Sequence, residues 1–359
     1  MKAIIIYSLA LAALASCAKS EEVTTPDNPT PLQPKEIHIS AAIEASAQTK
    51  AVTREVTTLE GPIDGTADIT NIQFLRKDDT AGKNSLSFDG ITAITGTRTK
   101  NDNDNTTTTD GDITFGTKQE YDLANNKHAY FVAYYPAGTV NNNVATFTID
   151  GKTDILYAPL FDAGCYTGIT SSPTMTFSHA LAQLEVVCKA EAGVSIDVIK
   201  EVWGKIKKIE IATKEKASYA YSDQKFTFST DESGGTKKLP LLGYDYKTAF
   251  DANGIEIPAS TNTTVNAAGM FAPAAASSTE ALTLTITTQI GSQSEVTTDV
   301  SVQLKDGSSS NKGFERGLKH TATLTFKSTT KEIKVTGTTI TPWGTGYKGE
   351  SDVTPTVTP

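Results

Sequence analysis

Residues 282–287 read Leu-Thr-Leu-Thr-Ile-Thr, and this short alternation decides the class of fold. Successive side chains of an extended chain point to opposite faces, so Leu282, Leu284 and Ile286 share one face and the threonines share the other. Threonine also favours strands over helices. The segment therefore predicts a β-strand with one apolar and one polar face.

The same alternation recurs along the chain, with Gly, Asn, Asp and Pro turns between the segments. The further segments that show it are residues 37–43, 72–74, 130–135, 146–149, 209–211, 296–304, 324–326 and 333–335. Short strands at this frequency are typical of antiparallel β-sandwiches. One segment predicts a helix instead: Ser195 is a suitable N-cap for residues 196–203, and Gly204 ends the segment.

Composition excludes several classes of protein. The chain has 359 residues, of which 38% are hydrophobic and 20% charged, and its formal net charge is -9. These values exclude a polytopic membrane protein and argue against a nucleic-acid binder, which would need a basic face. The length suggests two domains, each large enough to bury its own core.

The N-terminus predicts an export signal. Lys2 precedes the apolar residues 3–14, a stretch too short to span a bilayer as a permanent helix. Residues 14–17, Leu-Ala-Ser-Cys, resemble a bacterial lipobox, which predicts a lipoprotein signal peptide over 1–16 and an acylated, membrane-anchored Cys17. Residues 17–35 contain four prolines and few large apolar side chains, so we expect a disordered tether there.

The small residues 167–173 suggest where the folded part divides. We expect an N-terminal β-sandwich over 36–172, a C-terminal β-sandwich over 173–345 and a tail over 346–359. Under this division Phe177, Leu181, Leu184 and Val186 would be the first core residues of the C-terminal domain.

We find no motif for catalysis, metal binding or a cofactor. Residues 102–105, Asp-Asn-Asp-Asn, begin like a calcium loop, but its sixth and twelfth positions are Thr107 and Ile113 rather than Gly and Glu. Residues 344–349 match GxGxxG, yet only ten residues follow and no βαβ unit fits. The four histidines, which lie on separate segments, are His38, His128, His179 and His320. The sequence therefore predicts a protein that is not an enzyme and uses no cofactor.

Two cysteines besides Cys17 leave an alternative open. Cys165 and Cys188 lie in a chain expected to be exported, where oxidation permits a disulfide. Cys188, within the apolar stretch 184–190, is equally compatible with a small core residue.

Several segments together resemble the fimbrillin-like family, the lipoprotein pilins and accessory subunits of type V pili. Besides the lipobox at Cys17, they are AYYP at 133–136, DILYAP at 154–159, FSHALAQLEV at 177–186, MFAP at 270–273, GLKHTATLTF at 317–326 and ITPW at 340–343. The resemblance implies an all-β chain of two consecutive antiparallel, Greek-key, transthyretin-like β-sandwich domains. It also implies a surface-exposed outer-membrane lipoprotein that belongs to a fimbrium and functions in adhesion.

The resemblance further implies assembly by strand exchange. In such pilins a trypsin-like protease cuts behind an early strand, and a strand of the next subunit fills the groove. Here the removable strand would be residues 36–43, and cleavage would follow Arg54, or alternatively Lys50. Pro355 and Pro359 make the tail a poor donor strand, which favours a tip, accessory or anchor subunit over a stalk subunit.

The expected partners are other pilin subunits, the maturation protease, outer-membrane lipid and a host or bacterial surface ligand. The alternative is a surface glycan-binding lipoprotein whose exposed aromatic side chains stack on sugars. The aromatic residues considered for this role are Tyr166, Tyr219, Tyr221, Tyr244 and Tyr246. Residues 79–81, Asp-Thr-Ala, also resemble an acceptor for bacterial O-glycosylation.

Overall fold

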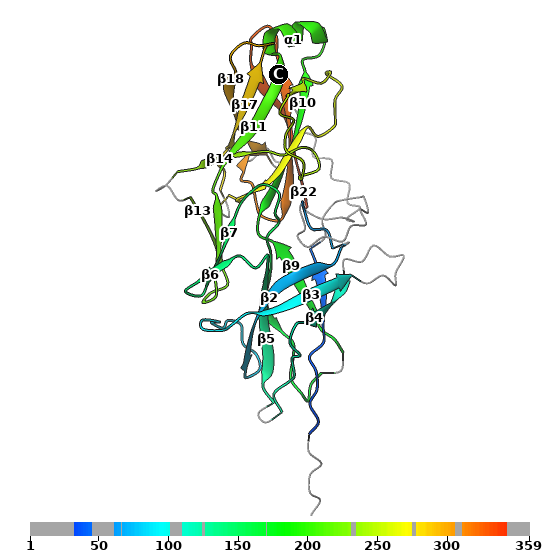
Figure 1. Cartoon of the computed structure of the whole chain (residues 1–359), viewed down its shortest axis with the longest axis vertical. Helices are drawn as coiled ribbons and strands as arrows, with labels where there is room; N and C mark the ends of the chain where they lie inside the picture. Colours follow the sequence, from blue (N-terminus) through cyan, green and yellow to red (C-terminus); the bar gives the residue numbers. More distant parts are fainter. Residues whose placement is uncertain are drawn as a thin grey trace, which may run out of the picture. The chain divides into compact units, whose positions relative to one another are not determined.

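Strands dominate the structure, a computed structural model in which the only helix of the described residues is α1 (Ile196–Trp203) (Figure 1). The structure describes residues 32–44, 61–65, 67–100, 110–123, 126–169, 171–230, 235–274, 278–305 and 311–342. Every alternating segment identified in the sequence lies in or overlaps a strand. The expectation of an all-β fold is therefore confirmed.

Seven strands of the first half form a closed barrel, which is a sandwich whose two sheets are joined at both edges. In the order in which they pair, they are β1 (Ile39–Ile43), β4 (Asp110–Phe115), β3 (Ile94–Lys100), β2 (Ile69–Asp79), β5 (His128–Tyr135), β8 (Leu156–Asp162) and β9 (Thr174–His179). β2, β3 and β4 are consecutive hairpin neighbours and β5 returns to the far side of β2, which is a Greek key.

The second half consists of two facing sheets. One contains β16 (Ala267–Phe271), β10 (Ala182–Ala190), β21 (Leu318–Phe326) and β22 (Ile333–Pro342). The other contains β14 (Lys237–Pro240), β11 (Lys205–Thr213), β17 (Leu282–Gln289) and β18 (Val296–Val302), with β15 (Ile255–Glu256) also on β11. A small hairpin joins β19 (Leu304–Lys305) to β20 (Asn311–Lys312).

Two pairs of strands in the described part of the chain run parallel, and a single parallel bridge joins Gly61 to Thr153. β1 runs parallel to β9, and β10 runs parallel to β21. All other strand pairs there are antiparallel.

A further sheet connects the two halves of the chain. It contains β13 (Phe226–Ser229), β12 (Lys216–Ala220), β7 (Val144–Thr148) and β6 (Thr139–Asn141), and β7 pairs with β12. Beneath it lies a core that takes Tyr134 and Phe147 from the first half and Tyr219 and Met270 from the second. The described residues from Pro34 onward accordingly group as one compact unit.

The domain boundary expected between residues 172 and 173 assigns β9 to the C-terminal domain, but β9 belongs to the first barrel. β9 pairs with β8 and with β1, so it completes the first barrel. Phe177 lies in the core of that barrel, Leu181 in the core shared by the two halves, and Leu184 and Val186 in the core of the second half. The FSHALAQLEV segment therefore crosses from one half to the other, and its apolar residues contribute to three separate cores.

The helix predicted from the sequence is confirmed. The Ser195 hydroxyl accepts a hydrogen bond from the Asp197 amide at 3.3 Å, and the Gly204 N–H closes the last turn on the Lys200 carbonyl oxygen. Ile199 and Trp203 are buried in the core of the second half. The Trp203 indole N–H donates to the carbonyl oxygen of Lys327 at 2.9 Å, so its polar atom has a partner despite burial.

Candidate functional site: the strand slot of the first barrel

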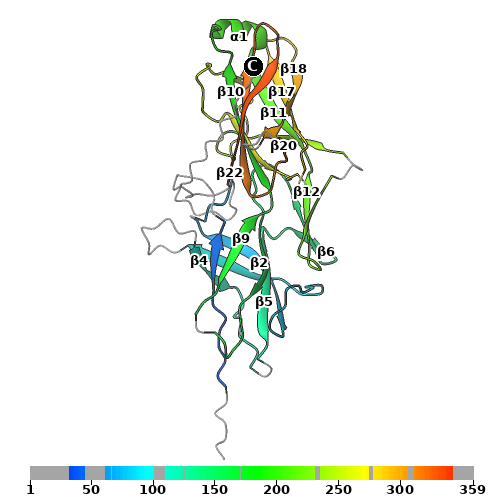
Figure 2. The same cartoon turned by 180° about the vertical axis from the view of Figure 1, so that it is seen from behind.

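β1 occupies an interior position in the barrel although it is the first strand of the described residues. It pairs antiparallel with β4, where Ala41 lies opposite Gly111, and parallel with β9, where Ala41 lies opposite Met175. Figure 2 shows this blue strand between β4 and β9. Without β1, the backbone N–H and C=O groups of both neighbours would lack their partners on this side. We call this position, between β4 and β9, the strand slot.

The inward side chains of this segment belong to the barrel core. Ile37, Ile39, Ala41 and Ile43 are each at most 2% exposed and pack in one cluster with Phe177. Burying an isoleucine stabilises by about 1.5–3 kcal/mol, so the three isoleucines together contribute about 5–9 kcal/mol as an upper bound. An empty slot is therefore strongly unfavourable, and any replacement strand must also present apolar side chains at alternate positions.

The N-terminal end of the segment is attached by several backbone contacts. Ile37 N–H donates to the Gln119 carbonyl oxygen at 2.8 Å, and Tyr121 N–H donates to the Lys35 carbonyl oxygen at 3.0 Å. The Lys35 ammonium donates to the Ile169 carbonyl oxygen at 2.7 Å. Lys35, assigned to the tether from the sequence, is therefore part of the folded body, because its polar groups find partners there.

The C-terminal end of β1 meets a buried pair of ionisable side chains. Glu44 N–H donates to the Phe177 carbonyl oxygen at 2.8 Å, and the next contact comes from His179 at the end of β9. Its Nε2 lies 3.3 Å from the Glu44 carbonyl oxygen and its Nδ1 lies 2.8 Å from Asp154 Oδ2. The side chains of His179 and Asp154 are both 0% exposed.

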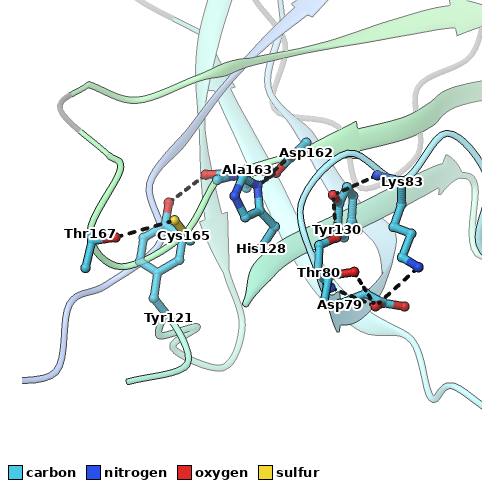
Figure 3. A network of polar contacts seen from close by, with 11 residues as sticks. Asp79, Thr80, Lys83, Tyr121, His128, Tyr130, Asp162, Ala163, Cys165 and Thr167 are labelled. Atoms are coloured by element: carbon cyan, nitrogen blue, oxygen red, sulfur yellow. Dashed lines mark hydrogen bonds and ion pairs between the residues drawn. The ribbon is translucent and has the colours of Figure 1, made fainter. Parts of the chain in front are cut away.

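A second histidine–aspartate pair lies in the same barrel at a less buried position (Figure 3). His128 Nδ1 is 2.8 Å from Asp162 Oδ2, and these side chains are 24% and 39% exposed. They come from β5 and β8, which do not pair with β1. Nearby, the Tyr121 hydroxyl donates to the Ala163 carbonyl oxygen at 2.8 Å, and burial raises the pKa of Tyr121 to about 12.

The Asp-Thr-Ala motif lies at the end of β2. Thr80 is exposed, and its backbone N–H donates to Asp79 Oδ1 at 2.7 Å, which lowers the pKa of Asp79 (Figure 3). The Tyr130 hydroxyl donates to the Thr80 carbonyl oxygen at 3.1 Å and accepts from the Lys83 amide at 3.2 Å. The motif is thus accessible on a turn that its neighbours hold in place.

Most residues predicted to carry function lie outside the described part of the chain. These are the lipid-attachment residue Cys17, the cleavage residues Lys50 and Arg54, the polar loop 102–105, and the tail with Pro355 and Pro359. Glu44 and Gly61 are the described residues on either side of the segment that contains Lys50 and Arg54.

The disulfide left open by the sequence is absent, since Cys165 and Cys188 are both free and buried. Cys188 lies in the core of the second half, and burial raises its thiol pKa to about 12. Cys165 lies in the first half, with its Sγ 3.9 Å from the Thr167 hydroxyl (Figure 3). The alternative of a small core residue is therefore the correct one for Cys188, because its strand β10 lies at the centre of a sheet.

The five tyrosines of the glycan-binding alternative do not form an exposed set. Tyr219, Tyr221 and Tyr246 are 0–2% exposed and belong to the core shared by the two halves. Tyr166 packs partly buried against the core of the barrel, and Tyr244 alone among the five is well exposed, at 71%. The prediction of exposed aromatic rings was wrong for the three buried residues, because a sheet missed in the sequence covers them.

Neither a metal cluster nor a membrane-spanning helix occurs in the described ranges. No three His, Cys, Asp or Glu side chains there come together in a way that would hold a metal ion. The helix present there is too short to cross a bilayer.

Solved structures with similar folds come from species of Bacteroides and Porphyromonas. A proposed cell adhesion protein of Bacteroides uniformis has 18% identity and a TM-score of 0.50, with 86% of this chain and 98% of that chain covered. Another from Bacteroides ovatus has 15% identity and a TM-score of 0.47, covering 87% and 99%. The tip fimbrial protein Mfa3 of Porphyromonas gingivalis, solved with a C-terminal truncation, has 11% identity and a TM-score of 0.39, covering 85% and 100%. A search of curated proteins finds no match.

A barrel completed by an interior N-terminal strand, followed by facing sheets, defines an all-β sandwich protein. The chain matches the fimbrillin-like family over residues 76–343, which is most of its length, and it belongs to that family. This membership makes it a pilus-related protein, in agreement with the resemblance seen in the sequence.

Proposed function

We propose that the protein is a surface-anchored fimbrial subunit, with a structural, tip or accessory role in a type V pilus, that joins its neighbours through the strand slot. The observation that carries this proposal is the position of β1, which pairs on both edges and buries Ile37, Ile39, Ala41 and Ile43 in the barrel core. A segment near the start of the chain thus completes a barrel whose other strands all come from beyond residue 68.

Cleavage behind β1 would make this strand replaceable. A trypsin-like protease that cuts after Arg54, or after Lys50, would separate β1 from the other strands of the barrel, which all begin at residue 69 or later. The slot would then accept a strand of the next subunit, whose backbone restores both ladders and whose alternate side chains refill the core. No catalytic residue of this chain takes part in such assembly.

Anchoring and adhesion complete the proposal. Acylation of Cys17 would hold the precursor at the outer membrane, and cleavage behind β1 would release the body from that anchor. The partners of the protein would be other pilin subunits, the maturation protease, outer-membrane lipid and a host or bacterial surface ligand.

Limited trypsin digestion of the mature chain tests the proposal. We expect one early cut at Arg54 by intact mass, loss of the fragment that carries β1, and ladders of oligomers on denaturant-free gels. Arg54→Gln should move the cut to Lys50, and the double variant with Lys50→Gln should stay monomeric. Loss of the fragment from a protein that remains monomeric would contradict a stalk role and favour a tip or accessory subunit, and retention of the fragment after the cut would contradict strand exchange at the slot.

A peptide competitor supplies the matched control. An excess of a peptide with the sequence of residues 36–43 should refill the slot and suppress the ladders. The same peptide with Ile39→Asp should not, because Ile39 is 2% exposed and belongs to the apolar barrel core, where a carboxylate would be buried among apolar side chains. Equal inhibition by both peptides would show that assembly does not use the slot.

A further inference from the structure

The buried Asp154–His179 pair connects the two chain segments that flank the exit of β1. His179 Nε2 lies 3.3 Å from the carbonyl oxygen of Glu44, the residue that follows β1. Asp154 Oδ2 lies 2.8 Å from His179 Nδ1 and accepts from the Ile63 backbone N–H at 3.0 Å. One pair of side chains therefore contacts the chain on both sides of the interval 45–60.

The barrel topology places the two side chains together. His179 ends β9 and lies opposite Leu156 of β8, two residues after Asp154. Gly61 is held beside them, since its N–H donates to the Lys152 carbonyl oxygen at 2.7 Å. The pair thus projects from the edge of the slot itself, at the end where β1 leaves the barrel.

Both ring nitrogens of His179 take part in the contact. The Glu44 carbonyl oxygen can only accept a hydrogen bond, so Nε2 is the donor there. Nδ1 shares the second hydrogen bond with the Asp154 carboxyl group, so the ring links that carboxyl group to the chain that leaves β1. Hydrogen bonds between side chains that are both 0% exposed are stronger than those in water.

We propose that the Asp154–His179 pair is a clasp that retains β1 in the barrel after the chain behind it has been cut, and thereby sets how fast the slot becomes free. This proposal rests on the proposed function, since it assumes that β1 departs. A cut after Lys50 or Arg54 creates a new chain end a few residues behind Glu44, and a strand peels most readily from a free end. Among the described residues, the contact from His179 to Glu44 is then the first side-chain contact that must break.

The clasp also makes an unfavourable contribution to the free energy of the filled slot. This contribution is removed when β1 leaves. Asp154 Oδ1 is buried and has no hydrogen-bond partner among the described residues. An unsatisfied carboxylate oxygen is penalised for as long as water is excluded. Loss of Glu44 from the slot would open this site to water, so the pair slows release without making the filled slot permanent.

The test separates release from cleavage and from assembly. In the mature full-length chain, Lys50 and Arg54 are replaced by Gln and a recognition site for a sequence-specific protease is placed between them. After complete cutting, the release of the fragment carrying β1 is followed with time by size-exclusion chromatography and intact mass. This design measures retention even where trypsin does not cut and where no oligomer forms.

His179→Asn is the informative variant, because the shorter amide can still donate to Asp154 but does not reach Glu44. We expect release about ten-fold faster than from the parent, which corresponds to loss of one buried hydrogen bond. The matched control is His128→Asn, which alters the other histidine–aspartate pair of the same barrel, away from β1. We expect its release rate to stay within about two-fold of the parent. Equal rates for both variants would overturn the clasp.

Amide hydrogen exchange of the uncut protein tests the clasp independently. This measurement applies even where a variant does not fold or where the fragment that carries β1 is not released. In the parent, the Glu44 and Ile63 amides should exchange as slowly as those of β1. His179→Asn or Asp154→Asn should speed the exchange of both amides while leaving β5 unchanged. Fast exchange of both amides in the parent would refute the clasp without any variant. Failure to form oligomers, by contrast, would count against a stalk role in the proposed function and not against the clasp.

Discussion

The hydroxyl oxygens of Tyr134 and Tyr221 lie 2.6 Å apart in a buried hydrogen bond that joins the two halves of the chain. Tyr134 belongs to β5 of the first barrel, and Tyr221 follows β12 of the connecting sheet. Burial raises the pKa of both side chains, so both hydroxyls stay protonated. The interface between the halves is therefore a packed core with an internal polar contact.

Removing the hydroxyl of Tyr221 should lower the stability of the protein, whereas removing the hydroxyl of Tyr219 should not. Tyr221→Phe leaves the Tyr134 hydroxyl without its partner and should lower the free energy of unfolding by about 1–2 kcal/mol. Tyr219→Phe removes a buried hydroxyl that has no partner among the described residues, so stability should be unchanged or rise by up to about 1 kcal/mol. Urea unfolding of both variants measures the difference, and equal destabilisation would contradict it.

His320 should make the protein less stable in mild acid. Burial lowers its pKa to about 4 from the usual 6.5, and its Nδ1 has no partner among the described residues. Because the folded pKa is depressed, the unfolded chain takes up the proton first as the pH falls. Its contribution to stability is thus intact above about pH 6.5 and is lost between there and about pH 4, by up to about 3 kcal/mol.

Comparison with His320→Phe isolates this effect. Phenylalanine suits the site, because the His320 ring packs edge-on to Phe314 with centroids 4.9 Å apart. Unfolding free energies measured at pH 7 and pH 4.5 should fall less steeply for the variant than for the parent. Identical pH dependence in the two proteins would show that His320 is accessible to protons in the folded state.

Gly204 should tolerate no side chain. Its φ is +66°, and a Cβ there would overlap the backbone carbonyl oxygen of Gln289. Gly204→Ala should therefore cost about 3 kcal/mol or more, from strain and from displacement of a rigid backbone. Gly193 is the control: its φ is +79°, but a Cβ meets nothing within 4 Å, so Gly193→Ala should cost only about 1 kcal/mol. Similar melting temperatures for the two variants would argue against the overlap.

The two core cysteines should behave as buried free thiols. In a Cys17→Ser form, iodoacetamide at pH 8 should leave Cys188 unmodified while the protein is folded, because burial raises its pKa to about 12. Denaturation without reductant should then allow both Cys165 and Cys188 to react, adding two alkyl groups by intact mass. A mass that shows no alkylation after denaturation would indicate a disulfide.

The local pattern of the sequence predicted most strands and the helix. The alternation of Ile37, Ile39, Ala41 and Ile43 predicted a strand with one buried face, and these four residues are buried. Ser195 and Gly204 predicted both ends of α1. Such features depend on neighbours within a few residues, so they can be predicted from a single sequence.

The sequence did not predict which distant strands pair with one another. The sequence indicated that Phe177 is a core residue, but not that β9 lies parallel to β1 in the first barrel rather than in the second half. The same limit concealed the connecting sheet, in which β7 meets β12, and with it the burial of Tyr219 and Tyr221. An aromatic residue on an alternating strand faces a core or solvent depending on which strand covers it.

The sequence by itself determined the all-β class, the family and the segment that fills the slot, because periodicity and short motifs are local properties. Only the tertiary structure decided that β1 lies between β4 and β9 and that His179 meets Asp154 and Glu44. These contacts join residues 25 to 135 positions apart, and their partners are chosen by how the cores pack across the whole barrel.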